Sequence, residues 1–286
     1  MIHVNEIELY FEPRNNILPL IPQMSGEPEM SSFDSAFLCG AIRQFKPNKI
    51  AEVGIAGGGT TAIILQCIHM LGLDTCNMYS IDHSEKFYRD NSIDSGYLGR
   101  VVLDLFPELK ARHRFLLGDI ACTWHEELKD CDFLIIDTTH FLPGEVLDFI
   151  TLLPILKNGA IVVLHDIRLN QMRNREAVAT GVVFSNSVGE KYLSWDSTSA
   201  DHYPNIGAVV INDHTRKNIC NMFLSLLLTW SYLPNEKQIA GYRSVIEKFY
   251  DKALVDIFDV AITLNKNTYQ KNKSKGLMGR VMENAD

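Results

Sequence analysis

Short apolar runs recur between residues 49 and 166, and longer segments of helical character separate them. The runs read KIAEVG, MYSID, RFLLGD, DFLIID and AIVVLHD, and each is bounded by Gly or Asp. Runs that are apolar on both faces are typical of buried strands in a parallel sheet that helices cover. The alternation therefore predicts a doubly wound α/β fold.

Two later runs, KYLSWD and IGAVVIND, do not continue the alternation. They are close enough in sequence to pair with each other, which favours an antiparallel pair of strands added at one edge of the sheet. Together with the five earlier runs they predict a mainly parallel, seven-stranded, Rossmann-like sheet with an antiparallel edge strand. We expect this domain to span residues 31–213.

The segments on either side of this domain have different patterns. Four prolines within residues 1–30 preclude a long regular element there and favour an arm lying over the body. A helix is expected from Ser32, as its N-cap, to a point before Pro47.

Beyond Asp213 the pattern favours helices rather than further strands. NICNMFLSLLLTWSYL and a segment from Glu236 to about Leu264 have helical character. Residues 214–270 thus form a predicted helical extension that caps the domain or supports a homodimer. Residues 271–286 lack an apolar period and are expected to be mobile.

The composition excludes some classes of partner. A net charge of −8 argues against binding to a nucleic-acid backbone, which requires a basic surface. The six cysteines form no C-x-x-C pair and are interpreted as reduced core residues. No window approaches the roughly 20 apolar residues of a membrane span. We expect a cytoplasmic protein that acts on a small molecule.

The turn after the first apolar run, AEVGIAGGGTTA, contains four of the 18 glycines. Glycines permit positive φ and allow a ligand to approach the backbone, and ligands of open parallel sheets bind beyond the strand ends. Such a turn also suits a dinucleotide, or tight packing without any ligand. Asp82 and Asp119 end the second and third runs, where carboxylates suit a ribose and an adenine amino group, although helix capping is an alternative for each.

The order AEVGIAGGGTT, SIDHS, LLGDI, DFLIIDTTHF and LLPILKNGAIVVLHDI resembles the class I S-adenosylmethionine-dependent methyltransferases. Within that class, the chain is similar to small-molecule O-methyltransferases of the catechol type and of the sugar and macrolide branch. The resemblance covers about residues 32–212. It implies that the cofactor is S-adenosylmethionine, with its methionine end near four residues, Glu52, Gly54, Gly58 and Thr60. It also implies that Asp82 and the adjacent His83 lie near the ribose, and Asp119 and Ile120 near the adenine.

Four candidate catalytic residues, Asp137, His140, His165 and Asp166, follow the fourth and fifth runs. By the resemblance, Asp137 and Asp166 are metal positions for Mg²⁺ and His140 is a general base. Histidine suits this role because it titrates near neutral pH. Without metal, His140 would act directly, oriented by a carboxylate. His165 is interpreted as a substrate contact or as a structural histidine.

Ile167 departs from the catechol-type pattern, which has an asparagine ligand there. This departure leaves the metal open, and it favours a sugar or sugar-bearing acceptor over a catechol. Two alternative functions are the same fold with a hydroxylase-like reaction, and a non-catalytic relative that binds a nucleoside or a protein partner.

Overall fold

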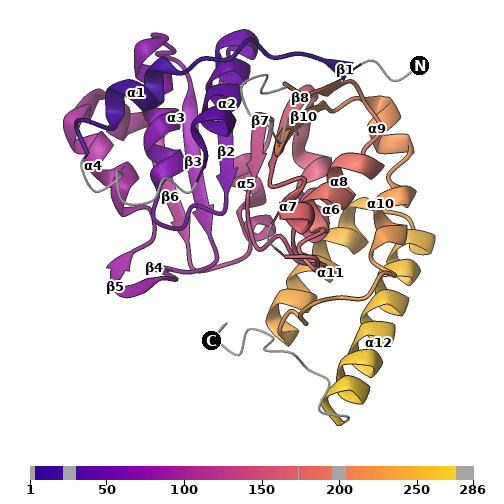
Figure 1. Cartoon of the computed structure of the whole chain (residues 1–286). Coiled ribbons are helices and arrows are strands. Elements are labelled where there is room, and N and C mark those ends of the chain that lie inside the picture. Colours follow the sequence, from indigo (N-terminus) through magenta and orange to yellow (C-terminus); the bar gives the residue numbers. More distant parts are fainter. Residues whose placement is uncertain (1–3, 22–29, 173, 195–203, 275–286) are drawn as a thin grey trace.

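The computed structural model describes residues 4–21, 30–172, 174–194 and 204–274 of the 286-residue chain (Figure 1). Its main sheet has the strand order β1-β9-β10-β8-β7-β2-β3-β6. The strands are β1 (Val4–Asn5), β2 (Lys49–Val53), β3 (Asn77–Asp82), β6 (His113–Leu117), β7 (Cys131–Ile136), β8 (Leu156–His165), β9 (Lys191–Tyr192) and β10 (Ile206–Val210).

The strand directions confirm the predicted sheet. Strands β6, β3, β2, β7 and β8 are mutually parallel, and β10 is antiparallel to both β8 and β9. These strands are the seven that the sequence predicts. The N-terminal arm adds an eighth, β1, which pairs parallel to β9 at the edge.

Helices cover both faces of the sheet, because successive side chains of β7 are buried in two different hydrophobic cores. Phe133 and Ile135 belong to the core on the side of α2 and α3, whereas Leu134 and Ile136 belong to the core on the side of α6. The helices are α1 (Glu12–Ile17), α2 (Ser32–Phe45), α3 (Gly59–Met70), α4 (Tyr97–Leu105), α5 (His125–Leu128), α6 (Gly144–Leu152), α7 (Leu169–Met172), α8 (Ala179–Asn186), α9 (Asp213–Lys217), α10 (Cys220–Ser225), α11 (Glu236–Phe249) and α12 (Lys252–Ser274).

Helix α2 begins at Ser32 and ends before Pro47, as predicted, but its N-cap lies one residue earlier. Ser31 is the cap, because its Oγ accepts a hydrogen bond from the backbone N–H of Asp34 at 3.0 Å. The apolar period shows where the helix lies but does not distinguish between two adjacent serines as its N-cap, which is why the sequence predicted Ser32 instead of Ser31.

The C-terminal extension is helical, but its helices are shorter than the apolar pattern predicts. Asn265 of α12 accepts a hydrogen bond from the backbone N–H of Trp230 and donates to the carbonyls of Leu226 and Leu228, which holds the chain in a non-helical path after α10. The single helix expected from Glu236 is two helices, because Asp251 accepts from the backbone N–H of Leu254 and begins α12.

The extension is part of the core rather than an appendage. Phe223 of α10, Ile246 of α11 and Phe258 of α12 are buried in the same cluster as the α6 face of the sheet. Figure 1 shows these helices beside α6 and α8. The expected mobile tail lies outside the described residues from position 275 onward. No described helix has both the length and the apolar character to span a membrane.

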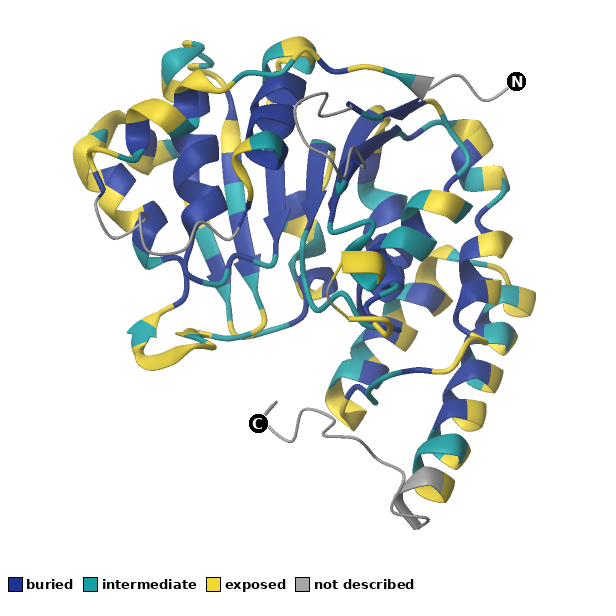
Figure 2. Cartoon of the chain, in the orientation of Figure 1, coloured by how far each residue is buried: buried dark blue, intermediate teal, exposed yellow. Residues whose placement is uncertain are grey.

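All six cysteines are free, and five of them are buried as predicted, whereas Cys220 is exposed. A second, two-stranded sheet is formed by β4 (Lys86–Phe87) and β5 (Asp90–Asp94), which follow β3. This hairpin projects from the body and is largely exposed (Figure 2). The strand order reverses between β2 and β7, and open α/β sheets bind ligands beyond the strand ends at such a point.

Candidate active site at the ends of strands β2, β7 and β8

The turn between β2 and α3 holds two glycines in the left-handed region. Gly54 has a φ of +88°, and Gly58, the N-cap of α3, has a φ of +86°. A Cβ on Gly54 would lie 2.0 Å from the carbonyl oxygen of Asp137, and one on Gly58 would lie 2.8 Å from Cα of Gly96. Both positions therefore require glycine for backbone conformation and for close packing. The turn also brings the end of β2 directly against the end of β7.

Asp82, the last residue of β3, braces this turn. Its Oδ2 accepts hydrogen bonds from the backbone N–H groups of Ile55, at 3.1 Å, and Ala56, at 3.0 Å, while Oδ1 accepts from Ser84 at 3.0 Å. Nδ1 of the half-exposed His83 lies 3.5 Å from Asp82 Oδ1. The carboxylate thus organises the turn, a role that the sequence pattern did not indicate. Contact of Asp82 and His83 with a ribose stays a prediction.

Glu52 lies beneath the turn, in the interface between the sheet and α3. It is fully buried, and its Oε2 accepts hydrogen bonds from the hydroxyls of Thr61, at 2.7 Å, and Ser80, at 3.0 Å. The Ser80 hydroxyl also lies 3.0 Å from Nε2 of His113, whose pKa burial lowers to about 4. Thr60 is 5% exposed. Contact of Glu52 or Thr60 with a cofactor stays a prediction.

Asp119, beyond the end of β6, is held by the C-terminal extension. Its Oδ2 accepts a hydrogen bond from Nζ of Lys237 on α11 at 2.8 Å, and its Oδ1 accepts from the backbone N–H of Ile120 at 2.9 Å. The hydrogen bond from Lys237 lowers the pKa of Asp119. A Cβ on Gly241 of α11 would lie 3.1 Å from Ile120 Cδ1. The expected adenine end therefore borders α11, which the sequence did not indicate.

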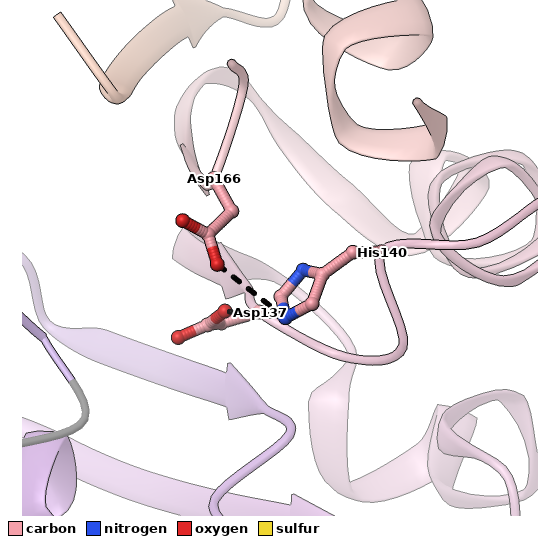
Figure 3. Close-up of side chains that lie close together, drawn as sticks. All are labelled: Asp137, His140 and Asp166. Carbon is pink, nitrogen blue, oxygen red and sulfur yellow. Dashed lines mark ion pairs between the residues drawn. The ribbon is translucent and has the colours of Figure 1, made fainter. Parts of the chain in front are cut away.

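The side chains of Asp137, His140 and Asp166 converge at the ends of β7 and β8 (Figure 3). His140 Nε2 lies 3.5 Å from Asp166 Oδ2 and 3.9 Å from Asp137 Oδ1. Each side chain is partly exposed, by 15–22%, so solvent reaches the cluster. The structure thus brings three of the four predicted catalytic residues together at one accessible point.

Two of these residues have left-handed backbone. The φ of His140 is +64° and that of Asp166 is +59°, which is uncommon for residues other than glycine and is concentrated at functional sites. The Asp166 carboxylate is fixed by Asn205, whose Nδ2 donates to Oδ1 at 2.6 Å. Because Asn205 holds Oδ1, Oδ2 is the oxygen that faces His140.

His165, the fourth candidate, is buried behind the cluster. Its Nδ1 lies 3.1 Å from Asp137 Oδ1, and its Nε2 lies 3.4 Å from Asp34 Oδ2 of α2. Burial alone would lower the pKa of His165, but the nearby charge of Asp137 and the hydrogen bond with Asp34 raise it well above its ordinary value. In the same way, burial would raise the pKa of Asp137, but His165 and His140 lower it. His165 therefore supports Asp137 rather than facing the accessible side.

Three further residues of the site, Asp34, Glu145 and Asn205, were missed by the sequence analysis. Asp34 lies in the first turn of α2, Glu145 in the first turn of α6, and Asn205 directly before β10. Each is a polar residue that stands at an element boundary, where a capping role is an adequate explanation. Only the folded chain brings them to His165, His140 and Asp166.

The cluster has the donor set of a divalent cation site. Three potential ligand atoms lie within 4.8 Å of one another, one each from Asp137, His140 and Asp166. Two carboxylate oxygens and one imidazole nitrogen suit Mg²⁺ or Mn²⁺ with water at the remaining positions. The residues therefore fit such an ion, and His140 joins the two carboxylates of the predicted metal set.

Residues 51–167 match the family model described as a methyltransferase domain. This part of the chain is a methyltransferase domain. The matched range contains the glycine turn, Asp82, Asp119 and the Asp137, His140 and Asp166 cluster. The predicted family and the enzyme class, an S-adenosylmethionine-dependent methyltransferase, are thus confirmed, and the roles of single residues stay predictions.

Solved structures similar to this methyltransferase have low sequence identity to it. The O-methyltransferase TomG from Streptomyces achromogenes, involved in tomaymycin synthesis and in complex with SAM, is 12% identical, with 72% of this chain and 92% of that chain covered and a TM-score of 0.49. An O-methyltransferase from Bacillus cereus in complex with SAH is 14% identical, with 70% and 91% covered and a TM-score of 0.49. A putative caffeoyl-CoA O-methyltransferase from Staphylococcus aureus is also 14% identical, with 69% and 91% covered and a TM-score of 0.48.

No curated protein sequence matches the chain.

Proposed function

We propose that this methyltransferase moves a methyl group from S-adenosylmethionine to a hydroxyl of a small acceptor. The observation that carries the proposal is the contact between Gly54 and the backbone of Asp137 at the point where the strand order reverses. It places the glycine turn and the cluster of Asp137, His140 and Asp166 side by side. A cofactor on the turn would therefore present its methyl group to an acceptor held at the cluster.

For the cofactor, we propose that the turn at Gly54 and Gly58, with Thr60, borders the methionine end. Asp82 and His83 would border the ribose, and Asp119 with Ile120 the adenine. These residues follow successive ends of neighbouring parallel strands, β2, β3 and β6, so they form one continuous edge. Glu52, at the end of β2, would also border the methionine end, and it braces α3 through its hydrogen bond from Thr61.

In the reaction that we propose, the acceptor oxygen attacks the methyl carbon in line with the carbon–sulfur bond. This bond breaks, and its electron pair remains on sulfur, which gives S-adenosylhomocysteine. The acceptor loses its hydroxyl proton, and Nε2 of His140 is the group placed to take it. Asp137 and Asp166 orient the imidazole and stabilise its positive charge.

As an alternative to this direct role of His140, we propose that Asp137, Asp166 and His140 hold a divalent cation such as Mg²⁺. Such an ion lowers the pKa of a hydroxyl bound to it. Asn205 would then keep the Asp166 carboxylate in place, since it holds the second oxygen of that group.

A sugar or sugar-bearing acceptor is favoured over a catechol. Ile167 provides no ligand at the position next to Asp166, and the side-chain amide of Asn205 is hydrogen-bonded to Asp166 Oδ1. The donor set therefore lacks the amide ligand of the catechol-type pattern, and we propose that this difference disfavours chelation of a vicinal diol in the catechol manner.

The function is tested by calorimetry and by an acceptor screen. We expect S-adenosylmethionine and S-adenosylhomocysteine both to bind, and a sugar in a panel of sugars and phenols to release S-adenosylhomocysteine, followed as homocysteine. If neither S-adenosylmethionine nor S-adenosylhomocysteine binds, the result would favour a non-catalytic relative. Binding with a hydroxylated product and no homocysteine would favour the hydroxylase-like reaction.

We propose further that the chain acts in the cytoplasm on a small molecule and not on nucleic acid, in keeping with its net charge of −8. Self-association through the C-terminal helices stays a prediction. Exposed apolar side chains on α10, the turn after it and α12 are consistent with it, namely Leu224, Leu227, Leu228, Val260 and Leu264.

A further inference from the structure

Helix α11 of the C-terminal extension borders the expected adenine end of the site with two residues of one face. Lys237, in its first turn, donates a hydrogen bond from Nζ to Oδ2 of Asp119 at 2.8 Å. Four residues later, a Cβ on Gly241 would lie 3.1 Å from Cδ1 of Ile120. Residues four apart lie on the same side of a helix. The extension therefore supplies part of the surroundings of Asp119 and Ile120.

The backbone of α11 is held in place, whereas the side chain of Lys237 is not. Three residues of this helix, Ile239, Tyr242 and Ile246, are buried in the core on the side of α6. The side chain of Lys237 is 76% exposed. Lys237 can therefore leave Asp119 by a rotation of its own side chain, without any change in the fold.

The two oxygens of the Asp119 carboxylate have different partners. Oδ1 accepts a hydrogen bond from the backbone N–H of Ile120, at 2.9 Å, and Oδ2 accepts from Lys237. The side chain of Asp119 is only 24% exposed, so the more exposed Lys237 covers it from the solvent side. A ligand that needs Oδ2 as an acceptor therefore meets the ammonium group of Lys237 first.

The 6-amino group of an adenine and the ammonium group of Lys237 are both hydrogen-bond donors. A hydrogen bond to an ionised acceptor is stronger than one between neutral groups, and Lys237 neutralises the charge of Asp119. An exposed ion pair changes an equilibrium by no more than about fivefold, so a ligand can break it. The amino group and Lys237 therefore compete for Oδ2, and neither excludes the other completely.

We propose that Lys237 is a specificity-determining residue of the cofactor site, which competes with the 6-amino group of adenine for Oδ2 of Asp119 and turns into the solvent when an adenosyl compound binds. This inference rests on the proposed function, because it takes Asp119 as the adenine contact. Its consequence is that S-adenosylmethionine and S-adenosylhomocysteine bind more weakly than Asp119 alone would allow.

The test is calorimetric titration of the full chain with S-adenosylhomocysteine. Lys237→Met keeps an unbranched side chain and removes the ammonium group. We expect its Kd for S-adenosylhomocysteine to be about two- to fivefold lower than that of the wild type, which is the size of effect that an exposed ion pair has. In Asp119→Ala we expect weaker binding, and addition of Lys237→Met to that variant should bring no gain, because the contested acceptor is gone.

A second ligand and a second lysine serve as controls. S-inosylhomocysteine has a 6-oxo group, which accepts a hydrogen bond and does not compete with Lys237, so Lys237→Met should bring no gain in its affinity. Lys266 of α12 donates to Glu236 of α11 at 2.7 Å, an ion pair of the same extension that does not involve Asp119. Lys266→Met should leave the Kd for S-adenosylhomocysteine unchanged.

Three results would overturn the role of Lys237 alone. They are unchanged or weaker binding of S-adenosylhomocysteine by Lys237→Met, an equal gain for the adenosyl and inosyl compounds, and unchanged binding by Asp119→Ala. In each case the wild type still binds S-adenosylhomocysteine, so the proposed methyl transfer stands. If the wild type does not bind it at all, both proposals fail together.

Discussion

Nδ1 of His165 lies 3.1 Å from Oδ1 of Asp137, so a buried histidine stands directly behind one carboxylate of the accessible cluster. Nε2 of the same ring faces Asp34 of α2 at 3.4 Å. His165 therefore links the first helix of the domain to the strand that carries Asp137. The pair raises the pKa of His165 and lowers that of Asp137, in each case against the effect of burial.

This pairing predicts how stability depends on pH. A raised pKa in the folded state means that the contribution of His165 is complete below its unfolded pKa of about 6.5 and is lost as the pH rises through the folded value. The lowered pKa of Asp137 means that its contribution is present above about pH 3.9 and is lost as the pH falls further. Between these limits both groups contribute fully.

We therefore expect the free energy of unfolding of the wild type to fall as the pH rises above about 6.5, and to fall less steeply in His165→Gln. Urea denaturation at several pH values measures both slopes. His214→Gln, at an exposed position of α9, is the matched control and should keep the wild-type slope. Equal slopes in the wild type and His165→Gln would contradict the pairing.

Replacement of His140 by Gln should separate catalysis from cofactor binding. We propose the imidazole as the general base, and general base catalysis typically contributes about 10²- to 10⁴-fold to a rate. We expect kcat with an acceptor found in the screen to fall by that amount, while calorimetry shows unchanged binding of S-adenosylmethionine. A His140→Gln enzyme with full turnover would exclude His140 as the base.

Much of the fold could be predicted because the strands are buried on both faces. Phe133 to Ile136 are all apolar, and β8 repeats this pattern, so the run itself indicates a parallel strand. The extension was predicted less well. Its apolar run around Leu226 continues beyond the end of α10, and only the tertiary contact with Asn265 determines where that helix stops.

The candidate site was predictable where residues follow strand ends in sequence. Asp137, His140 and Asp166 belong to such ends, so the topology alone brings them together. Glu145 and Asn205 were not predictable, because their partners depend on the backbone path at His140 and Asp166, both of which have positive φ. Lys237 was missed for a different reason, since it reaches Asp119 from a helix 118 residues later in the chain.

The donor set at the cluster predicts binding of a divalent cation. We expect the wild type to bind one Mn²⁺, a stand-in for Mg²⁺ that electron paramagnetic resonance detects, and Asp166→Asn to bind it at least about tenfold more weakly. Asn205→Ala should weaken binding by about 10- to 100-fold, because it releases the Asp166 carboxylate. Asp119→Asn, away from the cluster, should leave the Kd unchanged. Absence of Mn²⁺ binding in the wild type would favour the metal-free mechanism, with His140 alone taking the proton.

Two neighbouring glycines of the turn should differ sharply in their tolerance of a side chain. Ala at Gly58 would have to adopt the left-handed region, at a cost of about 1–2 kcal/mol, and its Cβ would also lie 2.8 Å from Cα of Gly96. Gly59 has no positive φ, and the nearest heavy atom to its Cβ would be Leu98 Cδ1 at 3.9 Å. Urea denaturation should therefore show lower stability for Gly58→Ala and no loss for Gly59→Ala, since Ala favours the helix that begins there. An equal decrease in the free energy of unfolding of both variants would contradict this explanation, because it would show that the positive φ and the close approach to Gly96 are not what requires glycine at position 58.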